Sequence, residues 1–234
     1  IMKIALLGYG RMGKEISKHA KERKHKIAYI LDKGYQEGEI NNADVAINFS
    51  VPDAAVSNIR LALEKKIPVV CGTTGWLKDY DLITSLCKSK KSAFLYASNF
   101  SVGVNLFFKI NHYVARIMQR YKTQYNSRVK ETHHINKLDK PSGTAITLAN
   151  DILKYTDYKD WSLEKSNNDL LEISSVRKGE IPGKHRVSYY SDIDKICIKH
   201  KAFKRDGFAI GAIIAAEWIL NKEGIFSMED VLSI

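Results

Sequence analysis

The chain has 234 residues, of which 44% are hydrophobic, so it is long enough for one large domain or two modest ones. No window approaches the roughly 20 uncharged apolar residues that span a bilayer, which excludes a membrane-spanning helix from the expected structure. The first apolar run is short and leads directly into glycines rather than a cleavage site, so we expect a soluble, cytoplasmic protein.

The formal charge of +11 suits an anionic partner. The sequence contains no nucleic-acid-binding motif and no long basic run, so we expect no nucleic-acid partner; a positive cleft that collects a small anion would account for the charge equally well. Three widely spaced cysteines, Cys71, Cys87 and Cys197, form no CxxC pair. We interpret them as reduced structural thiols and predict no metal site.

A strand and a glycine-rich turn open the chain. Residues 3–8 read as a buried strand, and a GxGxxG sequence follows and leads into a helical pattern. In such loops the first glycine permits a tight turn, the second lets a pyrophosphate approach the backbone, and the third lets helix and strand pack closely. The phosphates would lie at the helix N-terminus. The predicted cofactor-binding residues here are Gly8, Tyr9, Gly10, Arg11, Met12 and Gly13.

A second strand, residues 27–31, ends in Asp32, where a carboxylate could accept hydrogen bonds from the adenosine ribose hydroxyls. The alternatives are a turn without ligand for the glycines and an ordinary cap for Asp32. Asp32 alone favours NADH, whereas Lys33 or Arg11 could meet the 2′-phosphate of NADPH. The sequence therefore leaves the choice of cofactor open.

Further strands at residues 45–49, 69–71 and 93–97 alternate with helices at 53–64 and 79–88, which predicts a Rossmann-like, doubly wound parallel sheet. Two of these strands end in unusual loops. Each loop alone would more often be a plain turn, but ligands bind at the carboxyl edge of such sheets, so together we expect them to form the floor of a nicotinamide site. The predicted contacts are Gly72, Thr73, Thr74, Ala97, Ser98, Asn99 and Phe100.

The pattern changes after residue 105. A helix at 106–121 is followed by strand-like alternation at 124–135, 173–178, 185–191 and 195–200. This order predicts a smaller α+β domain with a mostly antiparallel sheet. The polar segment 157–169 is expected to be a surface excursion.

Residues 131–145, ETHHINKLDKPSGTA, join the end of one predicted strand to the start of a helix. Ser142 is predicted to cap that helix, with Gly143 and Thr144 in its first turn. The open N–H groups of that turn, together with Lys137 and a histidine, would receive a carboxylate. A histidine beside an ammonium can also deliver protons. An anionic substrate that must be protonated fits this segment.

Three other interpretations compete. His133 and His134 could bind a metal, but there is no third ligand at a recurring spacing and no HExxH motif. They could be strand residues with satisfied side chains, and the Ser-Gly-Thr corner could be only a cap. The glycine-rich cofactor half in the same chain favours the chemical interpretation.

The same segment resembles the signature of the bacterial dihydrodipicolinate reductase family. The resemblance extends over nearly the whole chain, through the glycine loop, the GTTG at residues 72–75 and the NFSVGVN at 99–105. The closing pattern of the family is matched by His200, Ala202, Arg205, Phe208, Ala209, Gly211 and Ala212.

This resemblance implies an NADH- or NADPH-dependent reductase of lysine and diaminopimelate synthesis, acting on a cyclic imine dicarboxylate. It implies that His133 is the catalytic acid/base and that Lys137 donates a proton and touches the substrate. His134, Ser142, Gly143 and Thr144 would hold the substrate.

The resemblance also implies a homotetramer assembled through the second-domain sheets. Residues 1–100 and 207–234 would form the dinucleotide-binding domain, which includes a final helix at about 208–220, and residues 101–206 would form the substrate-binding and tetramerisation domain.

The chain departs from the family pattern at three points: a glycine loop shorter by one residue than the common form, Lys140 in place of a usual alanine, and Asn48 where an aspartate is common. Two other functions are compatible with the layout. A small-acid dehydrogenase of the semialdehyde or homoserine type would leave the GTTG and Pro-Ser-Gly-Thr motifs unexplained. A nucleotide-sensing regulator would not need His133 and Lys137.

Overall fold

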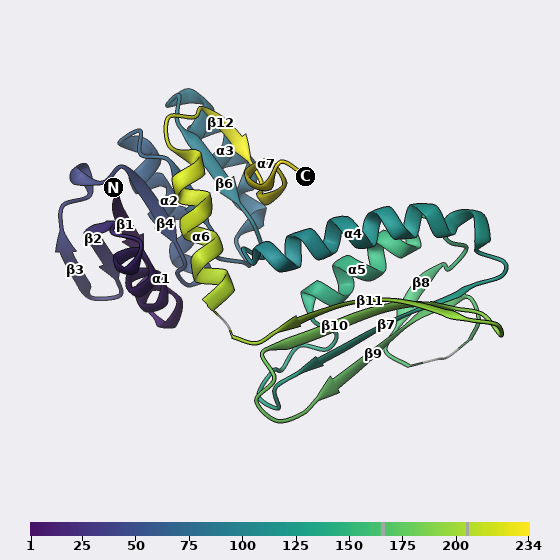
Figure 1. Ribbon diagram of the computed structural model, residues 1–234. Helices are drawn as coiled ribbons and strands as arrows, with labels where there is room; N and C mark the ends of the chain where they lie inside the picture. The colour runs from purple at the N-terminus through teal and green to yellow at the C-terminus, as the bar shows by residue number, and fades with distance from the viewer. Residues whose placement is uncertain (165–166, 205) are drawn as a thin grey trace. The chain divides into compact units, whose positions relative to one another are not determined.

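The computed structural model describes residues 1–164, 167–204 and 206–234 and divides into two compact units (Figure 1). The first unit comprises residues 1–102 and 206–234, and the second comprises residues 103–205. Arg205, part of the expected closing pattern, lies outside the described residues, as do positions 165 and 166 of the expected surface excursion. None of the described helices combines the length and apolar character that a membrane crossing requires.

The first unit contains a seven-stranded sheet in the order β12-β6-β5-β4-β1-β2-β3. All neighbouring strands are parallel except β2 and β3, which form an antiparallel hairpin. The predicted parallel sheet is therefore confirmed, and β3 and β12, which were not predicted, are additions at its two edges. The strands are β1 (Lys3–Leu7), β2 (Lys26–Asp32), β3 (Tyr35–Gly38), β4 (Val45–Asn48), β5 (Val69–Cys71), β6 (Ala93–Tyr96) and β12 (Gly224–Phe226).

Helices cover both faces of this sheet. Because successive strand residues point to opposite faces, Ile4 and Leu6 of β1 pack into the core with α1 and α6, while Ala5 and Leu7 pack into the core with α2 and α3. This two-sided burial explains why the central strands are almost uniformly apolar. The helices are α1 (Arg11–Glu22), α2 (Pro52–Glu64), α3 (Tyr80–Ser89), α6 (Asp206–Ile219) and α7 (Met228–Leu232), with short 3-10 turns at Ile40–Asn42 and Leu77–Asp79.

The second unit contains a five-stranded sheet in the order β11-β10-β7-β9-β8. The pairs β11–β10 and β10–β7 are antiparallel, whereas β7–β9 and β9–β8 are parallel. Strand β8 lies in the segment expected to be a surface excursion; its three residues extend the sheet edge instead. The strands are β7 (Asn126–His133), β8 (Asp160–Ser162), β9 (Leu170–Arg177), β10 (Gly183–Tyr190) and β11 (Lys195–Ala202).

Two helices, α4 (Val102–Met118) and α5 (Gly143–Leu153), contribute to the core on one face of this sheet (Figure 1), and a 3-10 turn, Gln119–Tyr121, follows α4. Phe107 of α4 and Leu148 of α5 pack with Val129 of β7 and Ile173 of β9. The alternation of buried and exposed residues along β7 follows from this arrangement, because every second side chain faces the helices. Glu131 and His133 stand on this buried face.

Candidate active site

The glycine loop of the first unit has the backbone that its sequence predicts. Gly8 has φ +99°, a conformation that favours glycine, and a Cβ at this position would collide with the carbonyl oxygen of Phe49. A Cβ at Gly13 would collide with the carbonyl oxygen of Gly8. These two glycines are therefore required by the close approach of β1, β4 and α1.

Gly10 differs from its two neighbours in the motif. It precedes the first residue of α1, and a Cβ built on it would meet nothing within 4 Å. The helix has no side-chain cap at this end, so its first N–H groups are available to an anion. Open space at the second glycine, beside a helix N-terminus, fits the approach of a pyrophosphate. Arg11 is exposed in the same turn, while Tyr9 and Met12 pack partly against the core.

Asp32 ends β2 and is exposed. Its Oδ1 atom accepts a hydrogen bond of 2.9 Å from the backbone N–H of Lys33, which is the turn-capping role considered as the alternative. The second carboxylate oxygen can still accept a hydrogen bond from a ribose hydroxyl. Lys33 is also exposed, so both a carboxylate and a cation stand at the end of this strand.

The GTTG turn follows β5, and its polar groups are largely used within the protein. Thr73 is buried; its Oγ1 atom accepts a hydrogen bond of 2.9 Å from the N–H of Ser50, and its carbonyl oxygen accepts one of 2.7 Å from the indole of Trp76. A Cβ at Gly72 would collide with the ring of Phe49. Thr74 is exposed and follows these anchored residues. The turn is thus held rigidly against the end of β4.

The loop after β6 contains residues of two kinds. Phe100 is 1% exposed and packs in the core beside Phe49, with ring centroids 5.6 Å apart, so its side chain serves the fold. Ser98 is exposed and Ala97 and Asn99 are half-buried. Because β5 and β6 are parallel neighbours, the GTTG turn and this loop leave the same edge of the sheet.

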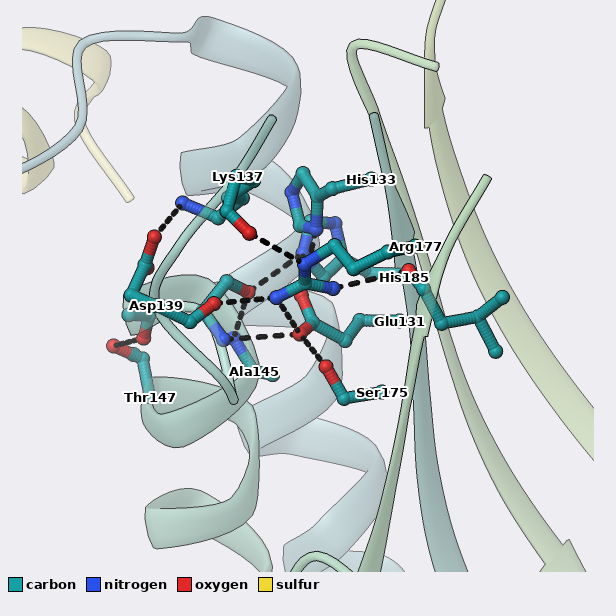
Figure 2. A network of polar contacts seen from close by, with 12 residues as sticks. Glu131, His133, Lys137, Asp139, Ala145, Thr147, Ser175, Arg177 and His185 are labelled. Atoms are coloured by element: carbon teal, nitrogen blue, oxygen red, sulfur yellow. Dashed lines mark hydrogen bonds and ion pairs between the residues drawn. The ribbon is translucent and has the colours of Figure 1, made fainter. Parts of the chain in front are cut away.

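In the second unit, the structure brings His133 against a buried carboxylate. Glu131 is 0% exposed and His133 is 7% exposed, and their side chains lie on the same face of β7. The Nδ1 atom of His133 lies 2.7 Å from Oε2 of Glu131 (Figure 2). Sequence reasoning did not assign a role to Glu131, although its position two residues before His133 in a strand places both on one face.

Arg177, at the end of β9, contacts the same carboxylate. Its Nη2 atom lies 3.1 Å from Oε1 of Glu131, and that oxygen also accepts hydrogen bonds from the hydroxyl of Ser175 and, at 3.1 Å, from the backbone N–H of Ser142. Burial alone would raise the pKa of Glu131, but the contacts with His133, Ser142 and Ser175 outweigh it and lower the pKa well below its ordinary value. The carboxylate is therefore ionised at neutral pH.

Lys137 lies in the loop that follows β7. Its ammonium is 2.7 Å from Oδ1 of Asp139, and its carbonyl oxygen accepts a hydrogen bond of 3.1 Å from Nε of Arg177. Burial would raise the pKa of Asp139, but the contact with Lys137 lowers it overall. His134 follows the end of β7 and is half-buried. The loop thus holds an ammonium beside the strand end that carries His133.

Ser142 caps α5 as predicted. Its Oγ atom accepts a hydrogen bond of 3.2 Å from the N–H of Ala145, and its carbonyl oxygen accepts one of 3.0 Å from the N–H of Ile146. Gly143 is exposed and Thr144 half-buried in the first turn, where N–H groups have no partner in the helical ladder. This turn has the features of a carboxylate receptor.

His185 of β10 completes the cluster and was not predicted. Its Nε2 atom is 3.3 Å from Oγ of Ser142, and its ring centroid is 5.0 Å from that of His133. Burial, with a further effect from His133, lowers the pKa of His185 from 6.5 to about 3, so this imidazole is neutral.

One ligating atom from each of Glu131, His133 and His185 lies within 4.8 Å of the others, which is close enough to consider a metal site. The guanidinium of Arg177 already balances the charge of Glu131, and a cation placed among these groups would be repelled by it. The donor set therefore suits proton chemistry better than metal binding.

All three cysteines are free, as predicted. Cys71 and Cys87 are buried, and burial raises the pKa of each thiol to about 11. Neither thiol has the thiolate character that a semialdehyde dehydrogenase of the cysteine type would need. The polar groups of 131–145 and the glycine loop, rather than these two buried thiols, are the features suited to catalysis.

Comparison with known proteins agrees with this geometry. Residues 2–100 match the family model described as "Dihydrodipicolinate reductase, N-terminus", and residues 103–232 match "Dihydrodipicolinate reductase, C-terminus". The 4-hydroxy-tetrahydrodipicolinate reductase of Christiangramia forsetii is 51% identical, over 99% of this chain and 98% of the relative. The enzyme of that name from Archaeoglobus fulgidus is 32% identical, over 99% of this chain and 100% of the relative.

A solved structure, the dipicolinate-bound dihydrodipicolinate reductase of Paenisporosarcina sp. TG-14, has the same fold, with a TM-score of 0.77, 20% identity and 97% coverage of both chains. Two family models cover nearly every residue, and a relative above 50% identity spans the full length. The chain belongs to the dihydrodipicolinate reductase family.

Proposed function

We propose that this chain reduces the cyclic imine dicarboxylate formed from 4-hydroxy-tetrahydrodipicolinate to tetrahydrodipicolinate, a step of lysine and diaminopimelate synthesis. As a reductase of its family it uses NADH or NADPH. One observation supports the assignment of residues. The contacts of Glu131 and Arg177 hold His133, the Lys137 loop and the N-terminus of α5 together in one network. These are the groups that a dianionic substrate requiring a proton would need.

Cofactor binding is assigned to the first unit. The open space at Gly10 and the uncapped start of α1 would take the pyrophosphate, and Asp32 would take the adenosine ribose. The exposed residues Thr74 and Ser98 and the half-buried Asn99 would lie along the nicotinamide. The bound cofactor supplies the hydride.

Substrate binding is assigned to the second unit. One carboxylate of the substrate would accept hydrogen bonds from the N–H groups of Gly143 and Thr144, where the helix dipole of α5 favours negative charge. His134 and the ammonium of Lys137 would hold the substrate from the loop after β7. Ser142 acts indirectly, because its hydroxyl already caps the helix.

Reduction adds one hydride and one proton, so the protein must supply the proton. We assign this to His133 and Lys137, of which His133 acts as acid/base and Lys137 as proton donor. The carboxylate of Glu131 lies 2.7 Å from Nδ1 of His133 and would hold the imidazole in place for this step.

A coupled assay tests the reaction. The preceding synthase, supplied with pyruvate and aspartate semialdehyde, generates the substrate in the cuvette, and the absorbance of NADH or NADPH at about 340 nm is followed. We expect oxidation only when the synthase and this protein are both present. Initial rates measured in parallel with NADH and with NADPH show which cofactor the protein prefers. Equal absorbance traces with and without this protein would overturn the proposed function.

We further infer a cytoplasmic homotetramer assembled through the second-unit sheets. Both helices that pack on this sheet lie on one face, and Arg128, Arg186 and Lys199 stand on the other, which no described helix covers. Light scattering during size-exclusion chromatography should give about four times the 26.5 kDa mass of the chain. A monomer mass at micromolar concentration would contradict the tetramer. It would not contradict the reductase activity, which the coupled assay tests.

A further inference from the structure

We propose that Glu131 and Arg177 are positioning residues of the reductase: Glu131 sets the orientation and tautomer of His133, and Arg177 joins that carboxylate to the loop that carries Lys137. The inference rests on the proposed roles of His133 and Lys137. Neither Glu131 nor Arg177 needs to touch the substrate to act in this way.

The two oxygens of Glu131 have different partners. Oε1 accepts from three donors, namely Nη2 of Arg177, the backbone N–H of Ser142 and the hydroxyl of Ser175 (Figure 2). Oε2 faces Nδ1 of His133 at 2.7 Å. Three donors from two separate elements, strand β9 and the start of α5, fix the first oxygen, so the second oxygen is held in place against the imidazole.

This arrangement selects one tautomer of His133. The contact between Nδ1 and Oε2 is a 2.7 Å ion-pair distance without the alignment of a hydrogen bond, but an ionised carboxylate can only accept, and an unprotonated Nδ1 so close would set its lone pair against the oxygen, so we assign the proton to the nitrogen that faces it. Nδ1 therefore keeps its proton, and Nε2 is the nitrogen that exchanges a proton with a reacting group. A Cβ at Gly183 would lie only 3.3 Å from Nε2, so the absence of a side chain at this position leaves room on that side of the ring.

Arg177 extends the same support to the Lys137 loop. It stands opposite His133 in the parallel pairing of β7 with β9. Its Nε atom donates to the carbonyl oxygen of Lys137 at 3.1 Å, and Nη2 donates to the carbonyl oxygen of Asp139 and to Glu131. One rigid guanidinium thus contacts both the carboxylate beside His133 and the loop that carries Lys137. A lysine side chain could not make both sets of hydrogen bonds.

The Glu131→Gln variant tests the first half of the proposal. Because Oε1 already receives three donors, the amide oxygen should take that position and the amide NH₂ should face Nδ1 of His133. The NH₂ group would then donate to Nδ1, and the neutral imidazole should carry its proton on Nε2 instead. The substitution inverts the tautomer with little change in shape.

Nitrogen-15 NMR of protein labelled at its seven histidines measures this directly, at a pH where the ring is neutral. Signals of His133 are identified by their loss in His133→Gln. We expect proton attachment at Nδ1 in the wild type and at Nε2 in Glu131→Gln. In the coupled assay, kcat should fall at least about 10²-fold, as a wrong tautomer costs, with KM within about threefold.

Arg177→Lys tests the second half, with Arg60→Lys as the control, because Arg60 is an exposed arginine of α2 that also forms an ion pair, with Glu64. We expect kcat to fall about tenfold or more in Arg177→Lys and to stay unchanged in Arg60→Lys. In a third variant, Arg177→Ala, added guanidinium at millimolar concentration should restore part of the rate, because it can take the place of the missing side chain between Glu131 and the Lys137 loop.

A wild-type imidazole protonated at Nε2 would overturn the proposal even if Glu131→Gln does not fold. Full activity in both Glu131→Gln and Arg177→Lys would also overturn it. If the wild type shows no reductase activity at all, the proposed function fails, whereas the tautomer measurement still decides the role of Glu131.

Discussion

The ammonium of Lys137 lies 2.7 Å from Oδ1 of Asp139, two residues further along the same loop. The side chains are 24% and 57% exposed, so water screens this ion pair, and such pairs contribute about 0–1 kcal/mol. The pair of Glu131 with Arg177 is different, because its side chains are 0% and 8% exposed. The two pairs lie close together in the loop and strand that form the site, which allows a direct comparison.

We predict that Asp139→Asn changes the free energy of unfolding by less than about 1 kcal/mol. Glu131→Ala should lower it by about 3–5 kcal/mol, because the substitution leaves the Arg177 guanidinium buried without its counter-ion. Urea unfolding followed by circular dichroism measures both. Equal losses of unfolding free energy in the two variants would show that the difference in burial does not determine how much each ion pair stabilises the fold.

The glycine loop gives a second prediction. Gly8→Ala should destabilise the fold by about 2 kcal/mol or more, because the new methyl group meets the Phe49 carbonyl and φ is +99°. Gly10→Ala should fold normally, since nothing stands within 4 Å of its Cβ, but should bind NADPH at least about tenfold more weakly.

Thermal unfolding and a fluorescence titration with NADPH separate these two effects. If Gly10→Ala binds the cofactor as tightly as the wild type, the pyrophosphate does not approach the second glycine. Gly13→Ala serves as a further control, since its methyl group would meet the Gly8 carbonyl and it should therefore behave like Gly8→Ala.

The pH dependence of stability follows from His185. Burial is the main cause that lowers its pKa from 6.5 to about 3, so between these values the unfolded chain binds more protons than the folded one. Its contribution to stability is therefore complete above pH 6.5 and is lost as the pH falls toward 3. We expect a loss of at most about 1.4 kcal/mol per pH unit from this group.

His185→Gln should make the fall in unfolding free energy between pH 6.5 and 4.5 shallower than in the wild type. This pH range lies above the ordinary glutamate pKa of 4.5. The pKa of Glu131 is lowered, so its contribution to stability is lost only in stronger acid and does not affect the slope measured here. Urea unfolding at a series of pH values measures the slope. An unchanged slope would mean that His185 is already protonated in the folded protein.

Chelation tests the interpretation of the cluster of Glu131, His133 and His185. Since Arg177 already balances Glu131, we expect EDTA treatment followed by gel filtration to leave the coupled rate unchanged. Elemental analysis should find less than about 0.1 equivalent of any transition metal. Loss of activity that returns with added Zn²⁺ would assign the cluster to a metal.

Features that depend on neighbouring residues were predictable from the sequence. Gly13 is fixed by a contact within one strand-turn-helix unit, and Ser142 caps the helix that begins after it. Gly8 was predictable from the motif alone, although the Phe49 carbonyl that excludes a side chain there follows β4. The parallel sheet followed from the alternation of apolar strands and helices. In each case the pattern that predicts the feature lies in a short stretch of sequence, even where the contact that it makes is with a distant residue.

Features that depend on register or lack a local pattern were not predictable. Strand β3 is exposed at all four residues, and β8 has only three residues, so neither shows the alternation that marks a strand. Arg177 and His185 reach the site because β9 and β10 pair with β7 at one particular register. Nothing in the local sequence specifies that register, whereas Glu131 could have been found from the two-residue period of β7.

The turnover of His133→Gln and Lys137→Met in the coupled assay, with NADPH binding measured on the same preparations, tests the central claim most directly. We predict that kcat falls by about 10²-fold or more in each variant while the dissociation constant of NADPH changes less than about threefold. Full turnover in both variants, with the cofactor bound normally, would contradict the assignment of proton transfer to these two residues.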